Sequence, residues 1–100
     1  MLNPKQKAYL RGLANHLEPV FQIGKEGISL EMMEGISSYL AKHELMKVNM
    51  LANSTISYEE ASNIFEGYHI EVVQIIGHII VLYKHSSKAK EPIVLPKSKK

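Results

Sequence analysis

The stretch IGKEGIS at residues 23 to 29 places two glycines three positions apart, with a lysine between them. A glycine-flanked turn before a helix exposes backbone N–H groups beside the positive end of the helix dipole, which favours an anion such as phosphate. Lys25 would add positive charge, whereas Glu26 would repel phosphate. Because the Gly-x-x-Gly spacing also arises by chance, local chemistry favours a plain strand-to-helix turn over a binding loop, and both interpretations stay open.

Other kinds of chemistry find no support in the sequence. A P-loop needs Gly-Lys-Ser/Thr, but Gly27 is followed by Ile28, and a dinucleotide fingerprint needs a third glycine. The chain has no cysteine, no G-x-S-x-G elbow, and five histidines without the spacing of a metal site. We therefore expect no enzyme activity, no catalytic residue, no metal, no cofactor and no small-molecule substrate.

The net charge of +2 conceals a segregation of charge along the chain. Residues 1 to 11 carry three basic side chains and no acid, residues 84 to 100 carry six lysines against Glu91, and the part between is acidic. Exposed like charges build a local potential, which favours a polyanionic partner for the basic ends. The alternative is that these ends only aid solubility.

Length and composition predict one globular domain. The chain has 100 residues, of which 45% are apolar and 22% charged. We expect residues 1–85 to form the domain and residues 86–100 to form a basic, flexible tail. The N-terminus has no apolar leader core, and the longest apolar run, Ile79 to Tyr83, is too short to span a membrane. We therefore expect a cytoplasmic monomer that does not contact membranes.

Three helices are predicted from capping residues and apolar spacing. The first begins after Asn3 with Pro4 at its first position and carries an apolar stripe, consisting of Leu10, Leu13, Ala14 and Leu17. The second runs from 30 to 43 after a Ser29 cap. The third begins at a capping box of Ser57 and Glu60 and ends near Gly67.

Four strands are predicted between and after the helices, over residues 20–23, 45–51, 70–76 and 79–84. The last two form a hairpin through Gly77 and His78, and the unbroken apolar run of the last strand predicts a central position. The second strand alternates, so Lys47 and Asn49 should face solvent. The fold class is therefore α/β, a two-layer arrangement of helices on a four-stranded mixed sheet, with the glycine turn at the carboxyl end of the first strand.

In several longer motifs the chain resembles the stand-alone bacterial CRM domains, the YhbY-like RNA-binding family. The matching pieces are LRGLANHLEPVFQIGKEGIS at residues 10 to 29, HELMKVN at 43 to 49, VVQIIGHIIVLYK at 72 to 84 and VLP at 94 to 96. The resemblance implies a fold like the C-terminal domain of translation initiation factor 3, with sheet order 1-2-4-3. It also implies binding to ribosomal RNA in precursors of the large ribosomal subunit (pre-50S), and a role in ribosome assembly.

The resemblance implies the RNA-binding residues as well. The Gly-x-x-Gly loop would hold the RNA backbone as the loop of a KH domain does. The implied residues are Gly24, Lys25, Glu26 and Gly27 in the loop, Lys5, Lys7 and Arg11 in the basic first helix, and Lys47 and Lys84 in the strands. Glu26 departs from the family pattern, and Lys84 stands where many relatives have arginine. A protein-interaction module that docks on a ribosomal protein or translation factor, through the acidic middle and the wet face of the second strand, is the alternative.

Overall fold

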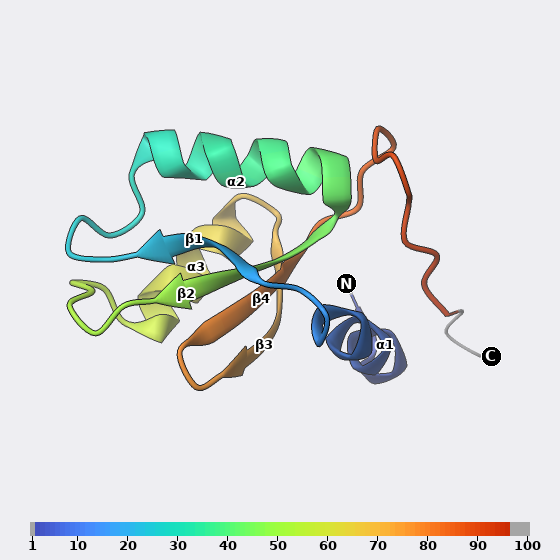
Figure 1. Cartoon of the computed structure of the whole chain (residues 1–100), viewed down its shortest axis with the longest axis horizontal. Helices are drawn as coiled ribbons and strands as arrows, with labels where there is room; N and C mark the ends of the chain where they lie inside the picture. The colour runs from blue at the N-terminus through green and yellow to red at the C-terminus, as the bar shows by residue number, and fades with distance from the viewer. Residues whose placement is uncertain (1, 97–100) are drawn as a thin grey trace.

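The computed structural model describes residues 2–96 of the chain. Seven elements follow one another in the predicted order (Figure 1). They are α1 (Pro4–Ala14), β1 (Pro19–Ile23), α2 (Leu30–His43), β2 (Leu45–Met50), α3 (Tyr58–Gly67), β3 (Glu71–Ile76) and β4 (Ile79–Tyr83). Within residues 2–96, no helix is both long enough and apolar enough to cross a membrane.

The four strands form one mixed sheet of order β1-β2-β4-β3, which confirms the predicted order. β1 and β2 are parallel, whereas β4 runs antiparallel to both of its neighbours. The apolar side chains of β4 from Ile80 to Tyr83 are buried, as a central strand requires, while Ile75 and Ile76 at the end of edge strand β3 are exposed. Gly77 takes a φ of +59° at the first position of the hairpin turn, as a type II′ turn requires.

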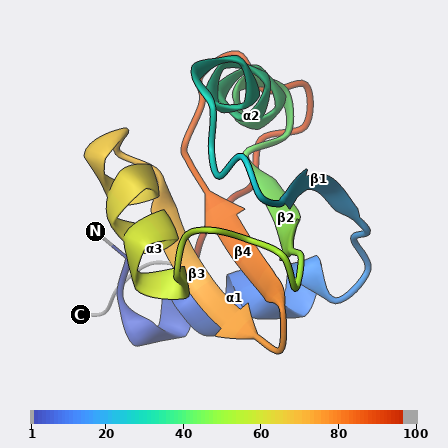
Figure 2. The ribbon, with the colours of Figure 1, turned by 90° about the vertical axis from the view of Figure 1, so that its left-hand side faces the viewer.

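Helices cover both faces of the sheet, which corrects the predicted two-layer arrangement. α2 and α3 pack on one face, around a core that includes Ile36, Phe65 and Leu82. α1 packs on the other face with Leu10 and Ala14 (Figure 2). An apolar stripe shows that a helix packs on a sheet but not which face of the sheet it covers, so the sequence could not place α1 on the second face.

The position of α1 also changes the second face of β2. The sequence analysis expected that face to be wet, but Leu45 is buried and Lys47 and Asn49 are half-buried. α1 contacts β2 and β3 on this side of the sheet. The alternation of the strand was therefore interpreted correctly, whereas the exposure of its polar face was not.

The predicted capping residues begin all three helices. Asn3 with Gln6, and Ser57 with Glu60, each form a complete capping box, and the hydroxyl of Ser29 accepts the backbone N–H of Met32. α1 ends at Ala14, so Leu17 lies beyond the helix but still packs against the core beneath it.

Glu44 lies between α2 and β2 and is completely buried. Its backbone is left-handed, with a φ of 66°, and its carbonyl accepts the N–H of Lys84. Its carboxylate accepts the N–H of Ser86 at 2.6 Å and the N–H of Ile93 at 2.7 Å, and the Nδ1 atom of His85 lies 3.1 Å away. One carboxylate therefore holds two points of the C-terminal segment.

The C-terminal segment from 86 to 96, which the sequence predicted as a flexible tail, lies against the domain. Ile93 and Leu95 pack on the core beneath α1, and the Gln6 side chain donates to the carbonyl of Pro96. Residues 97 to 100 of the predicted tail lie outside the described residues.

Burial, with the Glu44 charge as a second cause, raises the pKa of the neighbouring Tyr83.

Replacement of Glu44 tests how strongly this carboxylate holds the segment. Glu44→Gln keeps the shape but turns one hydrogen-bond acceptor into a donor, so one buried N–H loses its partner. We expect the free energy of unfolding to fall by about 2 kcal/mol and the amides of Ser86 and Ile93 to exchange faster. Urea unfolding and hydrogen exchange measure these effects, with Glu91→Gln as the exposed control. Unchanged exchange at both amides would contradict the anchoring role.

Two helical glycines give a matched test of packing. A Cβ atom at Gly35 would lie 2.9 Å from the Cζ atom of Phe21, whereas nothing lies within 4 Å of a Cβ atom at Gly12. Gly12→Ala should therefore raise the free energy of unfolding by about 1 kcal/mol. Gly35→Ala should lower it by about 1 kcal/mol because the Phe21 ring must move. Equal stabilisation by the two changes, measured by urea unfolding, would show that this ring is not fixed.

Candidate functional site

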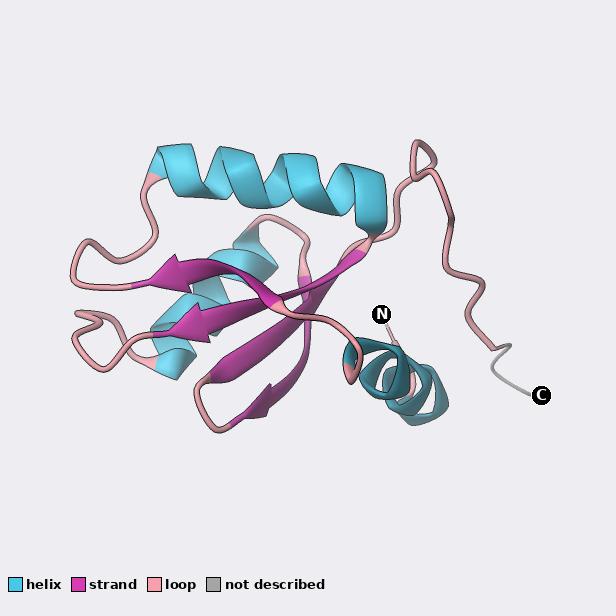
Figure 3. Cartoon of the chain, in the orientation of Figure 1, coloured by secondary structure: helices cyan, strands magenta, loops and turns pink. Residues whose placement is uncertain are grey.

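Residues 24 to 27 form a tight turn at the carboxyl end of β1, where the sequence analysis expected it (Figure 3). The N–H of Gly27 donates to the carbonyl of Gly24 at 3.0 Å, so Lys25 and Glu26 occupy the two central positions and are exposed. Within residues 2–96, no acceptor takes the backbone N–H of Lys25 or of Glu26. The turn therefore presents two backbone donors and one ammonium group to solvent.

The two glycines of the turn differ in how strongly their positions demand glycine. Gly27 has a φ of +67°, which places it in the left-handed region, and it is buried. Gly24 has no such φ, but a Cβ atom there would lie 3.4 Å from Asn53 and Leu51. Gly27 thus sets the shape of the turn, whereas position 24 leaves room for a small side chain in contact with the neighbouring loop.

That neighbouring loop, residues 51 to 57, joins β2 to α3 and lies beside the turn (Figure 1). The hydroxyl of Thr55 donates to the carbonyl of Lys25 at 3.0 Å. The hydroxyl of Ser54 donates to the carbonyl of Ile56 and accepts its N–H, which fixes the loop itself. The sequence analysis assigned no functional role to this stretch. It could not find the support that Thr55 gives because the two residues are 30 positions apart.

Four of the other predicted residues gather around α1, on the opposite face of the sheet from α2 and α3. Lys5 is exposed, and Lys7 and Arg11 are half-exposed. Among the described residues, none of the three forms an ion pair. Their charges are therefore free to act on a ligand.

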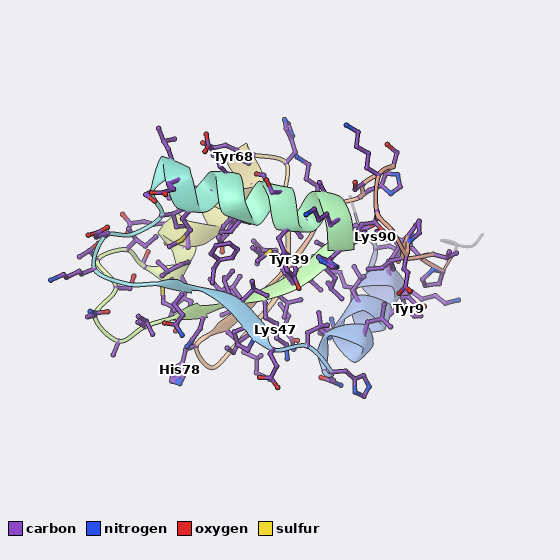
Figure 4. All side chains as sticks on the ribbon, turned by 45° about the horizontal axis from the view of Figure 1, so that its top comes forward. Tyr9, Tyr39, Lys47, Tyr68, His78 and Lys90 are labelled. Atoms are coloured by element: carbon purple, nitrogen blue, oxygen red, sulfur yellow. The ribbon has the colours of Figure 1, made fainter. Side chains whose placement is uncertain are left out.

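Lys47 and Lys84 each line a hollow that α1 borders. Lys47, on β2, lines a hollow of about 250 Å³ together with Arg11 (Figure 4). Lys84 lines another, of about 410 Å³, together with Gln6 of α1, and its ammonium group donates to the carbonyl of Tyr68 at 3.1 Å. The structure thus brings four of the predicted basic residues to the α1 side, Lys5, Lys7, Arg11 and Lys47. The ammonium group of Lys84 lies instead at the end of α3, and the Gly24–Gly27 turn lies apart from all of them.

Acidic side chains occupy the opposite side of the molecule. They are exposed along α2 and α3, at Glu31, Glu34, Glu59, Glu60 and Glu66. Because these helices and α1 lie on opposite faces of the sheet, the acidic middle of the sequence becomes an acidic face, and the basic first helix becomes a basic face. A polyanion would be attracted to the α1 side and repelled from the other.

These features define a small α+β domain that carries a Gly-x-x-Gly turn at the carboxyl end of a parallel strand and a separate basic helix. The chain belongs to the CRS1/YhbY (CRM) domain family, whose model matches residues 2–84. The resemblance drawn from the sequence motifs is thereby confirmed.

Relatives of this chain match over almost its whole length. A protein of Bacillus subtilis named "Probable RNA-binding protein YqeI" is 42% identical over 97 residues, which cover 96% of this chain and 100% of that protein. A protein of Haemophilus influenzae named "RNA-binding protein" is 39% identical, with 96% of each chain covered. The solution structure of the hypothetical protein SAV1595 from Staphylococcus aureus superposes with a TM-score of 0.77 at 42% identity, covering 96% of this chain and 100% of that one.

Alanine at each glycine of the turn tests their separate roles. Gly27→Ala forces a Cβ atom into the left-handed region and should lower the free energy of unfolding by about 1–2 kcal/mol. Gly24→Ala should change it by less than about 0.5 kcal/mol, because its φ suits any residue. Thermal or urea unfolding measures both, and Gly27→Asn should recover part of the loss since asparagine tolerates this region. Equal effects at the two positions would contradict the assigned conformations.

Proposed function

We propose that this chain binds RNA and that the Gly24–Gly27 turn holds an RNA phosphate. The observation that carries the proposal is the pair of free backbone donors at Lys25 and Glu26, in a turn fixed by glycine and by Thr55. Free N–H groups in a rigid turn bind an anion without a cost of ordering the loop. The names of the YqeI and Haemophilus influenzae relatives agree with this function.

The basic side of α1 provides the second contact. Lys5, Lys7 and Arg11, with Lys47 near the end of the helix, would bind phosphates further along the same RNA. Lys84, whose ammonium group lies at the end of α3, would add a contact at the edge of this side. Phosphate contacts position a protein on its nucleic acid and release counterions, which makes binding sensitive to salt. Because the turn and α1 lie apart, the ligand must be an extended or folded RNA rather than a single nucleotide.

The proposed RNA is ribosomal RNA in precursors of the large ribosomal subunit. The resemblance to stand-alone YhbY-like proteins supports this choice, and the proposed role is assistance in ribosome assembly. The same proposal makes the protein a cytoplasmic monomer without catalytic activity. The placement of basic and acidic side chains on opposite faces supports RNA binding, since an RNA held on the α1 side would lie away from the acidic helices.

Neighbouring residues of the turn should change RNA affinity in opposite directions. Lys25→Ala removes one ammonium group and should weaken binding several-fold, reducing the slope of log affinity against log salt by about 1. Glu26→Gln removes a carboxylate that repels phosphate and should tighten binding by about two- to fivefold. A fluorescence anisotropy titration with a ribosomal RNA fragment, repeated at several salt concentrations, measures both.

The controls for this titration lie on opposite faces of the molecule. Glu66→Gln, at the end of α3 away from the turn, should leave the affinity unchanged, whereas reversal of the three α1 charges should reduce both the affinity and the salt slope. Wild-type affinity in a variant with Lys5, Lys7, Arg11 and Lys25 all reversed would overturn the proposed function.

A protein-interaction module is the second candidate, and the acidic face of α2 and α3 favours it. Away from Lys42 at the end of α2, the exposed charges of this face are acidic, which suits a basic ribosomal protein or translation factor. The face of β2 no longer belongs to this candidate because α1 covers part of it. A partner that resists ribonuclease treatment and is lost in a Glu31, Glu34 and Glu59 charge-neutral variant would support this second function.

A further inference from the structure

A hollow of about 540 Å³ lies at the end of the molecule away from the Gly24–Gly27 turn. Its walls come from the end of α1, the last turn of α2, the start of β2 and the C-terminal segment. Leu45, in its wall, begins β2, whereas the turn follows Ile23, which pairs with Met50 at the end of β2. Five residues of strand separate the two places, about 16 Å at the usual rise.

One wall of this hollow is aromatic and the base is aliphatic. The rings of Tyr39 and His43 have centroids 4.3 Å apart, with planes inclined by 37°. Leu13, Leu17 and Ile93 provide the aliphatic part. A surface of this kind suits the flat face of a nucleobase, which gains free energy by stacking on aromatic side chains whatever its sequence.

The rim of the hollow carries positive charge. Lys42 and Lys90 line it and are exposed, and neither forms an ion pair among residues 2–96. Lys90 is labelled in Figure 4 together with Tyr39 of the aromatic wall. Glu91 supplies the one carboxylate of the lining. Two ammonium groups beside an aromatic wall complement a base that is joined to a phosphate, and they do not complement a purely apolar side chain.

The C-terminal segment closes one side of the hollow and is fixed in place. The Glu44 carboxylate binds the backbone N–H groups of Ser86 and Ile93, and the N–H of Lys90 donates to the carbonyl of Lys42 at 3.3 Å. The hydroxyl of Ser86 also donates to the carbonyl of Ala41. The hollow is therefore formed before any ligand arrives, which favours binding.

We propose that this hollow binds one unpaired nucleobase of the RNA, with Lys42 and Lys90 on the adjoining phosphates. The inference rests on the proposed function, because it takes RNA as the ligand, but it uses none of the residues assigned to phosphate binding above. It gives the protein a preference for RNA with an unpaired nucleotide at a fixed distance from the contact made by the turn.

The test uses the full chain labelled with ¹⁵N and the four ribonucleoside 5′-monophosphates as probes. We expect saturable shifts at the amides of Tyr39, His43 and Leu45 for at least one nucleotide, and binding of ribose 5-phosphate weaker by about tenfold or more. Leu13→Trp should fill the hollow and weaken nucleotide binding by about tenfold or more, while Leu30→Trp, at an exposed position on the other end of α2, should not. Tyr39→Phe should retain binding that Tyr39→Leu loses.

Several results of the nucleotide titration would overturn the inference. Three of them are the absence of any saturable shift, an equal response to ribose 5-phosphate, and unchanged nucleotide binding in Leu13→Trp. A fourth comes from N-acetyl-leucinamide, a probe for a protein side chain: shifts with this probe and not with the nucleotides would indicate a protein as the occupant. An RNA that binds without shifting these amides overturns this inference and leaves the proposed function standing. RNA affinity that ignores Lys25 and the α1 charges overturns the proposed function, while the nucleotide titration still reports on the hollow.

Discussion

The buried carboxylate of Glu44 joins parts of the chain that the sheet alone does not hold together. Glu44 ends α2, and its backbone carbonyl accepts the N–H of Lys84, the residue that follows β4. Its carboxylate accepts two N–H groups of the C-terminal segment. A carboxylate without contact with solvent is stable only if hydrogen bonds satisfy it, and two short backbone N–H contacts with a nearby histidine do so. The position of the C-terminal segment, and with it the hollow beside α1, depends on this interaction.

The two surfaces that we propose for RNA phosphates, the Gly24–Gly27 turn and the basic side of α1, lie at different places on the sheet. Parallel pairing of β1 with β2 directs both strand ends to the same edge, where the Gly24–Gly27 turn meets the loop that carries Thr55. β4 lies between β2 and β3, and α1 covers the face of the sheet opposite to α2 and α3. The fold therefore positions the Gly24–Gly27 turn, where we propose phosphate binding, at one end, and a basic helix on the face of the sheet opposite to the acidic helices.

Much of the fold follows from local patterns in the sequence. Capping residues such as Asn3 and Ser57 fix helix starts through contacts three residues away, and the unbroken apolar run of β4 determines its central position. The face that α1 covers could not be predicted, because an apolar stripe is compatible with either side of a sheet. The position of the turn and its exposed N–H groups were also predicted. Which N–H groups stay free was not, because the N–H of Gly27 is used within the turn itself.

Contacts between distant residues account for what the sequence could not give about the site. Glu44 lies within the matched motif HELMKVN, yet its partners are 42 and 49 positions away, so no local rule identifies it as an anchor. A lysine-rich composition predicts a flexible tail, whereas Ile93 and Leu95 in the same segment pack on the core. Composition describes the average of a segment, and two apolar residues with one buried acceptor decide its position.

The most direct test of RNA binding is a map of where RNA touches the chain. Ultraviolet crosslinking to a ribosomal RNA fragment, followed by mass spectrometry of the crosslinked peptides, reports contacts without assuming a role for any residue. The account predicts crosslinks in the peptides that contain residues 24 to 27 and α1. Crosslinks confined to the outer faces of α2 and α3, or none in either predicted peptide, would contradict it.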